Sequence, residues 1–336
     1  MHGELMAAEM AQQPDVLEAL IADAALICDR VRSVVPEPLH GVAFVARGSS
    51  DNAAVFGRYA CELSCGRPAA LVAPSVHTRY RARVDYSGQL VIGLSQSGAT
   101  PEIVTTCERL REAGARVIAV TNDPDSPLAA AADLSLPVRA GPELAVPATK
   151  TVTAQMLMLA LVAAALGRPG GRAGFCDDDL ARLPQAVAEA LADSERAAGL
   201  AAEWLACNRL VVVARGLMYA AALESALKIR ETAAIHAEGI SSADLLHGPI
   251  AALDADLPVL VLRGGGRTDS DLDALGERLA ADAIPNAWWW PSPGLAEMLQ
   301  PIVATVHGQQ LALAWARARG LDPDAPLGLS KVTATR

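Results

Sequence analysis

The tetrapeptide VARG occurs twice in this chain of 336 residues, at 45–48 and at 213–216. Each copy follows a β-branched apolar run and precedes a segment with helical periodicity, VAFVARGSSDNAAVFGRYACEL in the first half and LVVVARGLMYAAALESALKIRE in the second. Four residues could match by chance, but a matching strand and helix on both sides favour an internal duplication. The length also predicts two domains, because single cores stop growing at roughly 250–300 residues.

Short apolar runs alternate with amphipathic segments along the chain. In the first half we expect strands at 41–46, 69–73, 90–94, 116–121 and 134–138, and helices at 51–65, 101–113, 126–132 and 148–166. In the second half we expect strands at 209–214, 257–262 and 286–290, and helices at 177–206, 217–234, 270–282 and 296–319. This alternation predicts an α/β fold of two doubly wound parallel sheets flanked by helices.

A glycine-rich segment, 168–178, interrupts every periodic pattern and is the predicted linker between the domains. The predicted boundaries are a helical arm at 1–30, a first domain at 31–167, a second domain at 179–325 and a tail at 326–336.

Charge and composition exclude several classes of function. The net charge of −10 argues against a nucleic-acid or anionic-membrane partner, which would need a broad positive face. The longest apolar run, Met156 to Leu166, is shorter than the roughly 20 residues that span a bilayer, and the N-terminus does not read as a secretory signal. The six cysteines show no metal-site spacing. We therefore expect a cytoplasmic protein without a metal or other cofactor.

Hydroxyl side chains follow two of the predicted strands. LSQSGATPE, at 94–102, passes from a strand into a helix and carries Ser95, Ser97 and Thr100. The hydroxyls and the helix N-terminus could bind a phosphate group at the carboxyl edge of the sheet. Alternatively, Thr100 is an ordinary helix N-cap and the serines are turn residues. A second exit, RGSSDN with Ser49 and Ser50, favours the ligand-binding interpretation.

The second half contributes charged side chains. Glu224, Lys228 and Glu231 are spaced by four and three residues and so share one helical face. They could form a solvent-exposed ion-pair stripe, but the apolar character of the rest of this helix favours a polar cleft. His247 precedes Gly248 and Pro249 at a predicted chain turn.

Six motifs appear in order from about Met10 to the C-terminus: ARGSSDN, LSQSGATPEIV, GPELAVPATKT, ESALKIRETAAIHAEG, LLHGPIA and PLGLSKVTATR. Together they resemble the sugar isomerase (SIS) family, in particular the isomerase half of glutamine:fructose-6-phosphate aminotransferase and the SIS-type glucosamine-6-phosphate deaminases. The resemblance implies two tandem SIS domains, a homodimer, and a phosphorylated amino sugar or ketose as the substrate.

The resemblance also implies roles for individual residues. Substrate binding is implied for Ser49, Ser50, Ser95, Gln96, Ser97, Thr100, Val146 and Ala148. Glu231 would be the base that moves a proton between C1 and C2, and Glu224 and Lys228 would orient the reacting groups. His247 would assist ring opening from the partner subunit, and Lys331 could form a Schiff base with the ketose carbonyl. A carboxylate base beside a cation suits proton abstraction next to a carbonyl.

Two positions depart from the synthase pattern: Ala148 stands where we align a serine, and Asp51 replaces an aromatic residue. No glutaminase-like segment precedes the isomerase-like start, so we expect no supply of glutamine-derived ammonia. The expected activity is conversion of glucosamine 6-phosphate to fructose 6-phosphate and ammonia, through an enediol or enolamine. The alternatives are a deglycase or isomerase for another aminated sugar phosphate, such as fructosamine 6-phosphate, and a non-catalytic sugar-phosphate sensor.

Overall fold

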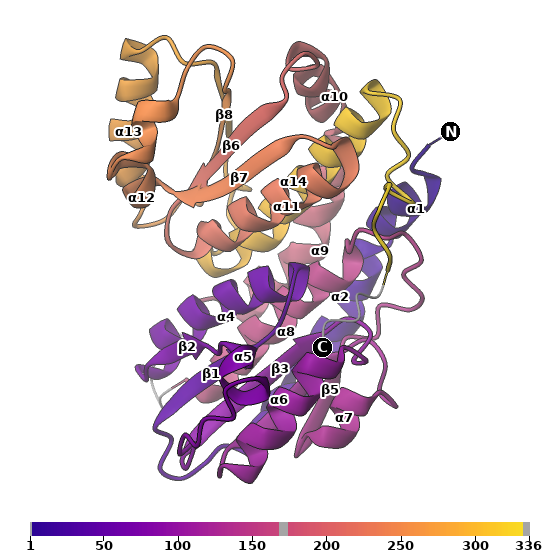
Figure 1. Cartoon of the computed structure of the whole chain (residues 1–336), viewed down its shortest axis with the longest axis vertical. Coiled ribbons are helices and arrows are strands. Elements are labelled where there is room, and N and C mark those ends of the chain that lie inside the picture. The colour runs from indigo at the N-terminus through magenta and orange to yellow at the C-terminus, as the bar shows by residue number, and fades with distance from the viewer. Residues whose placement is uncertain (1, 168–173, 332–336) are drawn as a thin grey trace. The chain divides into compact units, whose positions relative to one another are not determined.

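The computed structural model describes residues 2–167 and 174–331 (Figure 1). The chain divides into two compact units. We call them the first-half unit, with Asp15–Glu143 and Lys150–Cys176, and the second-half unit, with 2–14, Leu144–Thr149 and Asp177–Lys331. Residues 168–173 of the predicted linker and 332–336 of the predicted tail lie outside the described residues.

The first-half unit contains a five-stranded parallel sheet with the strand order β2-β1-β3-β4-β5. The strands are β1 (Gly41–Val45), β2 (Ala69–Leu71), β3 (Gln89–Ser95), β4 (Arg116–Thr121) and β5 (Leu134–Pro137). The helices are α2 (Gln13–Ala22), α3 (Ala24–Arg32), α4 (Ser49–Cys65), α5 (Pro74–Thr78), α6 (Pro101–Glu112), α7 (Pro127–Ala131) and α8 (Lys150–Leu166). Helices cover the sheet, so its inner strands are apolar on both faces.

Helix α8 explains the longest apolar run of the sequence. All of its residues except Ala164 are buried, because α3 and α4 pack against it within the same unit. A helix surrounded in this way is apolar on every side. Among the described residues, no helix is both long and apolar enough to cross a membrane.

The second-half unit contains a four-stranded parallel sheet with the order β7-β6-β8-β9. The strands are β6 (Arg209–Ala214), β7 (His236–Ser241), β8 (Val259–Leu262) and β9 (Asn286–Trp289). The α-helices are α1 (Glu4–Ala11), α9 (Asp177–Ala192), α10 (Ser194–Glu203), α11 (Tyr219–Ala233), α12 (Ser242–Leu246), α13 (Ser270–Ala281) and α14 (Gln300–Ala318). The 3₁₀ helices are η1 (Gly216–Met218), η2 (Pro249–Ala252) and η3 (Glu297–Leu299). Two parallel sheets flanked by helices confirm the predicted fold class.

Two features of the second half differ from the prediction. The helix expected at 177–206 is two helices, α9 and α10, which meet at Asp193. Strand β7 was not predicted, because an edge strand such as HAEGIS has no continuous apolar run. Its Gly239 is required by close packing, since a Cβ there would lie 2.6 Å from Cα of Leu223 in α11.

The two VARG copies occupy equivalent places. The first ends β1 and the second ends β6, and each of these strands lies second from the edge of its sheet. Their glycines, Gly48 and Gly216, have nearly the same left-handed φ, 60° and 61°. The shared topology and backbone conformation support the internal duplication that the sequence indicated.

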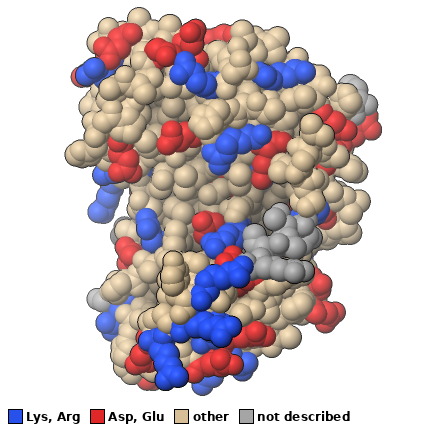
Figure 2. All heavy atoms as spheres, in the orientation of Figure 1, with Lys and Arg blue, Asp and Glu red and all other residues tan. Residues whose placement is uncertain are grey.

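On the face shown in Figure 2, acidic and basic side chains are interspersed.

Candidate active site

The two hydroxyl-rich strand exits meet at one edge of the first-half sheet. β1 and β3 are paired and parallel, with Val45 opposite Gly93, so their carboxyl ends lie side by side. α4 begins at Ser49 after β1, and α6 begins at Pro101 after β3. The chain order reverses between these strands, and such a switch point is where open α/β sheets bind ligands.

The loop after β3 is folded tightly on itself. The Ser95 hydroxyl accepts a hydrogen bond from the amide of Gly98 (3.2 Å) and lies 3.4 Å from the Thr100 hydroxyl. The Ser97 hydroxyl accepts from the amide of Ala99 (3.2 Å). Thr100 occupies the N-cap position of α6, but its side chain makes no capping hydrogen bond. The alternative in which the Thr100 hydroxyl caps the helix is therefore not what the structure shows.

Charged residues flank this edge of the sheet. Arg47 forms an ion pair with Glu102 (3.0 Å) in the first turn of α6. Asp51 lies in the first turn of α4, where burial raises the pKa of its carboxyl and Arg47 partly offsets the effect. Gln96 belongs to the same loop, and its carbonyl accepts from the amide of Asn122 (3.0 Å).

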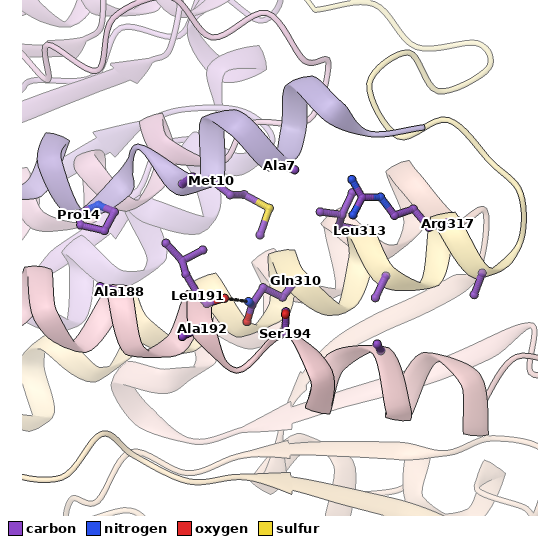
Figure 3. Close-up of a pocket in the computed structure, with 14 residues that line it drawn as sticks. Ala7, Met10, Pro14, Ala188, Leu191, Ala192, Ser194, Gln310, Leu313 and Arg317 are labelled. Carbon is purple, nitrogen blue, oxygen red and sulfur yellow. Dashed lines mark hydrogen bonds between the residues drawn. The ribbon is translucent and has the colours of Figure 1, made fainter. Parts of the chain in front are cut away.

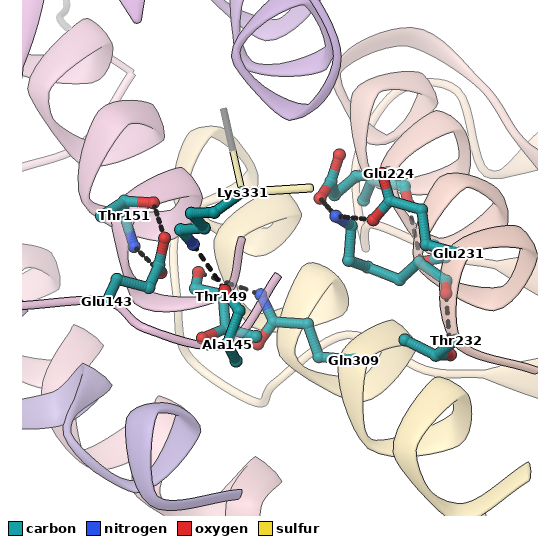
Figure 4. Close-up of polar contacts among 12 residues, drawn as sticks. Glu143, Ala145, Thr149, Thr151, Glu224, Glu231, Thr232, Gln309 and Lys331 are labelled. Carbon is teal, nitrogen blue, oxygen red and sulfur yellow. Dashed lines mark hydrogen bonds and ion pairs between the residues drawn. The ribbon is translucent and has the colours of Figure 1, made fainter. Parts of the chain in front are cut away.

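Three charged side chains of α11 lie together (Figure 4), and two of the three are buried. Glu224 and Lys228 are each 1% exposed, and Glu231 is 24% exposed. The Lys228 ammonium lies 3.5 Å from the Glu224 carboxylate and donates a hydrogen bond to Glu231. The interpretation of these residues as a solvent-exposed stripe is therefore wrong. We call these three residues the α11 charge cluster.

α11 packs against α14. The Thr232 hydroxyl, next to Glu231, donates to the carbonyl of Ala312 in α14 (3.1 Å). Of the three cluster side chains, that of Glu231 reaches furthest toward solvent. A partly exposed carboxylate beside a buried ammonium can accept a proton from a bound molecule while its orientation stays fixed.

The structure also brings Lys331 to the segment that carries Val146 and Ala148. The Lys331 amine donates to the carbonyl of Ala145 (2.7 Å), across 186 residues of sequence (Figure 4). Val146 and Ala148 are both partly exposed. Three of the predicted site residues are thus neighbours within the second-half unit.

Comparison with known proteins identifies the family of the chain. The family model for the SIS domain matches residues 40–165 and 205–284. The chain belongs to the SIS domain family. It is 34% identical over 311 residues to glutamine–fructose-6-phosphate aminotransferase of Acidithiobacillus ferridurans, covering 86% of this chain and 51% of that protein. The same enzyme of Gloeobacter violaceus is 34% identical over 352 residues, covering 97% and 58%. This SIS chain therefore spans about half the length of the curated relatives that it matches.

Solved structures show the same SIS fold. A protein from Silicibacter pomeroyi DSS-3, provisionally described as a phosphosugar isomerase, is 30% identical with a TM-score of 0.85, covering 96% of this chain and all of that one. The C-terminal domain of glucosamine-fructose-6-phosphate aminotransferase from Francisella tularensis has a TM-score of 0.84 at 24% identity, covering 96% and 98%. Glucosamine-6-phosphate deaminase from Thermotoga maritima has a TM-score of 0.79 at 21% identity, covering 99% and 100%.

His247 lies apart from the α11 charge cluster in its contacts. It is exposed at the end of α12, and its amide donates to the carbonyls of Ala243 and Asp244. Its imidazole forms no hydrogen bond or ion pair with any described residue. Nothing within the described chain joins His247 to Glu231 or Lys331.

An apolar cavity of the second-half unit is separate from the candidate site (Figure 3). It measures about 720 Å³ and is lined by α1, α9, α10 and α14, including Met10, Leu191 and Leu313. It contains none of the predicted site residues. Within the described residues, no group of three or more His, Cys, Asp and Glu side chains is placed to hold a metal ion.

The residues that hold the segment Leu144–Thr149 give no signal in the sequence. The buried Glu9 carboxylate accepts hydrogen bonds from the amides of Leu144 and Ala145. Gln309 donates to the carbonyl of Thr149 (3.1 Å), and the carbonyl of Asp324 accepts from the amide of Val146 (3.0 Å). Each is a polar residue of ordinary appearance in the sequence, so no local pattern distinguishes it from a surface residue.

Proposed function

We propose that this SIS chain converts glucosamine 6-phosphate and water to fructose 6-phosphate and ammonia. The observation that carries the proposal is the α11 charge cluster, in which a buried lysine fixes a carboxylate that is still partly exposed. The similarity to the isomerase half of the aminotransferases supports it.

In this proposal the first-half unit binds the phosphate. Ser95, Ser97 and Thr100 supply hydroxyl donors at the N-terminus of α6, where backbone amides and the helix dipole also favour an anion. Ser49, Ser50 and Gln96 contribute further polar groups at the same edge of the sheet. Val146 and Ala148 are proposed to contact the sugar.

The second-half unit is proposed to move the proton. In the open-chain aldehyde, Glu231 removes the proton from C2, and the electron pair forms the C1–C2 double bond. The C1–O double bond opens at the same time, and its oxygen takes up a proton from water, which gives an enolamine. Glu231 then returns its proton at C1 while the amine loses a proton to water, which leaves a hydroxyl at C1 and an imine at C2. A water molecule adds to C2 and ammonia leaves, which gives the ketone of fructose 6-phosphate. Lys228 holds the Glu231 carboxylate throughout, and Glu224 shares the charge of that lysine.

Lys331 and His247 complete the proposed roles. The Lys331 amine, when neutral, can replace ammonia at C2 and form a Schiff base that water then hydrolyses. His247 is proposed to assist ring opening across a homodimer interface. Its exposed imidazole is accessible to a second copy of the chain.

The test is an assay of ammonia and fructose 6-phosphate with purified protein and glucosamine 6-phosphate. We expect turnover by the natural chain and a loss of at least about a hundredfold in kcat for Glu231→Gln, because the amide cannot accept the proton. Phosphosugar binding should persist in that variant. Glu277→Gln, at an exposed position of α13, is the matched control and should keep full activity.

Two outcomes would contradict the proposal. A folded natural chain that releases neither product would refute the reaction, and unchanged turnover in Glu231→Gln would remove that residue from the mechanism. Binding of phosphosugars without turnover would instead indicate a sensor.

A second candidate is a deglycase or isomerase for fructosamine 6-phosphates. Asp51 and Ala148, the two positions that depart from the synthase pattern, favour this alternative because they change the side chains presented at the candidate binding segments. A panel of aminated and non-aminated sugar phosphates, compared by kcat/KM, distinguishes the two reactions.

A further inference from the structure

The chain near the C-terminus is tied to the N-terminal helix of the same unit. The Asp324 carboxylate accepts hydrogen bonds from the amides of Leu5 (3.0 Å) and Met6 (2.8 Å), in the first turn of α1. Amides in this position have no partner within their helix, and the helix dipole favours a negative charge there. Asp322 accepts from the amide of Gly3 (3.2 Å) and from that of Asp324 (3.1 Å).

Asp324 also contacts the segment that Lys331 reaches. Its main-chain carbonyl accepts from the amide of Val146 (3.0 Å), one residue after the carbonyl that binds the Lys331 amine. One residue therefore joins three pieces of the chain: α1 through its side chain, Leu144–Thr149 through its carbonyl, and the tail through its own backbone.

The segment Leu144–Thr149 is held from its other side as well. Glu9 of α1 binds the amides of Leu144 and Ala145, and Gln309 of α14 binds the carbonyl of Thr149. Because Glu9 and the amides bound by Asp324 belong to the same helix, α1 fixes both the segment and the start of the tail. The carbonyl of Ala145 is thus a fixed acceptor for Lys331.

The stretch between Asp324 and Lys331 has little packing of its own. Leu327 is fully exposed and Leu329 is 48% exposed. Seven residues of extended chain reach roughly 24 Å, so a tail released at Asp324 could place the lysine amine over a wide volume. The place of Lys331 consequently depends on the anchor at Asp324.

We propose that Asp324 is the positioning residue of Lys331. It fixes the tail to α1 and to Val146, so that the lysine amine stands beside the carbonyl of Ala145, in the segment that carries Val146 and Ala148. Asp324 itself touches no substrate. The inference rests on the proposed function for one point, the reaction of the Lys331 amine with a sugar carbonyl.

The first experiment is a double-mutant cycle with Asp324→Ala and Lys331→Ala, assayed by kcat and KM for glucosamine 6-phosphate. Asp324→Ala removes both side-chain acceptors and keeps the main-chain carbonyl. We expect kcat to fall by about tenfold to a hundredfold, because misplacement of a reacting group by about 1 Å costs that much, while KM changes by less. In the Lys331→Ala background the second substitution should change kcat by less than twofold.

The cycle separates positioning from general stability. Equal losses in both backgrounds, or no loss in the single variant, would overturn the proposal. Asp254→Asn is the control for loss of a surface carboxylate charge, since Asp254 also accepts from a backbone amide, that of Asp256 (2.9 Å), and pairs with Arg209 (3.1 Å) in an exposed loop. This variant should keep the activity of the natural chain.

A second experiment does not depend on the proposed reaction. The rate at which acetic anhydride acetylates Lys331, followed by mass spectrometry, reports whether the amine is held against the Ala145 carbonyl. Asp324→Ala should raise this rate at least threefold, and Asp254→Asn should not change it. An unchanged rate in a folded Asp324→Ala chain would overturn the inference even if the natural chain converts no phosphosugar.

Discussion

Replacing Lys228 by methionine tests how far the α11 charge cluster depends on its single ammonium. Methionine has a similar length and a high helix propensity, so the change isolates the charge. The ammonium stands 3.5 Å from the Glu224 carboxylate, and both side chains are 1% exposed. At an effective dielectric constant of about 20, two charges at that distance attract by about 5 kcal/mol.

We therefore expect Lys228→Met to lower the free energy of unfolding by about 3–5 kcal/mol, as when one member of a buried ion pair is removed. Urea unfolding followed by tryptophan fluorescence measures this, because Trp204 and Trp315 lie in the core that α11 helps to form. The double variant Glu224→Gln, Lys228→Met also removes the buried carboxylate charge. The double variant should recover at least half of the unfolding free energy that Lys228→Met loses.

Two outcomes would refute this reasoning. One is a decrease in the free energy of unfolding of less than about 1 kcal/mol in Lys228→Met, and the other is a double variant that is no more stable than Lys228→Met. Either result would mean that the Glu224 carboxylate does not need the lysine to be buried. Activity should fall in both variants, because Glu231 loses the group that orients it.

Two further predictions concern one position in each unit. Gly98→Ala should lower the free energy of unfolding by at least about 2 kcal/mol and weaken phosphosugar binding. The reason is that Gly98 has a φ of 62° and a Cβ there would lie 2.1 Å from the Ser126 hydroxyl. The control Gly199→Ala lies in α10, where a Cβ would meet no atom within 4 Å, and should be neutral or stabilising in urea unfolding. Burial against Trp289 lowers the pKa of His307 to about 4, so its protonation favours the unfolded chain and stability falls as the pH drops below about 6.5. His307→Gln should therefore remove about 2 kcal/mol of the stability loss between pH 7 and pH 5, and identical pH dependence in both proteins would contradict this assignment.

The parts of the site that were predicted are those fixed by local pattern. The exits after β1 and β3 could be located because an apolar run gives way to Ser, Gly and Thr within a few residues, and parallel pairing then places both exits at one edge. The spacing of Glu224, Lys228 and Glu231 likewise predicted a shared helical face. Their burial could not be predicted, since it depends on tertiary packing; α11 packs against α14, which follows about 70 residues later.

The contacts of the tail show the same limit more strongly. Lys331 was proposed from a resemblance to a family motif, and its hydrogen bond to Ala145 spans 186 residues. Glu9 and Asp324 gave no signal at all, because a single acidic residue in a polar context is normally a surface residue. Only the folded chain shows that both carboxylates bind backbone amides.

The duplicated halves explain why phosphate binding is assigned to one of them. After the first VARG come Ser49 and Ser50, whereas after the second come Leu217 and Met218, both buried. The exit of β8, which corresponds to that of β3, has backbone amides aimed at an anion, but Gly264 and Gly265 donate to the carboxylate of Asp269 (3.1 and 3.2 Å).

This difference is chemical rather than topological. A carboxylate at Asp269 accepts hydrogen bonds and repels a second anion. The hydroxyl of Ser95 is uncharged: it accepts from Gly98, and its proton can be donated to Thr100, 3.4 Å away, or to a ligand. The second half therefore fills its own anion position with a side chain. The first half has hydroxyl groups at the equivalent place, which is why we propose that it binds the phosphate and that the second half supplies the carboxylate and amine.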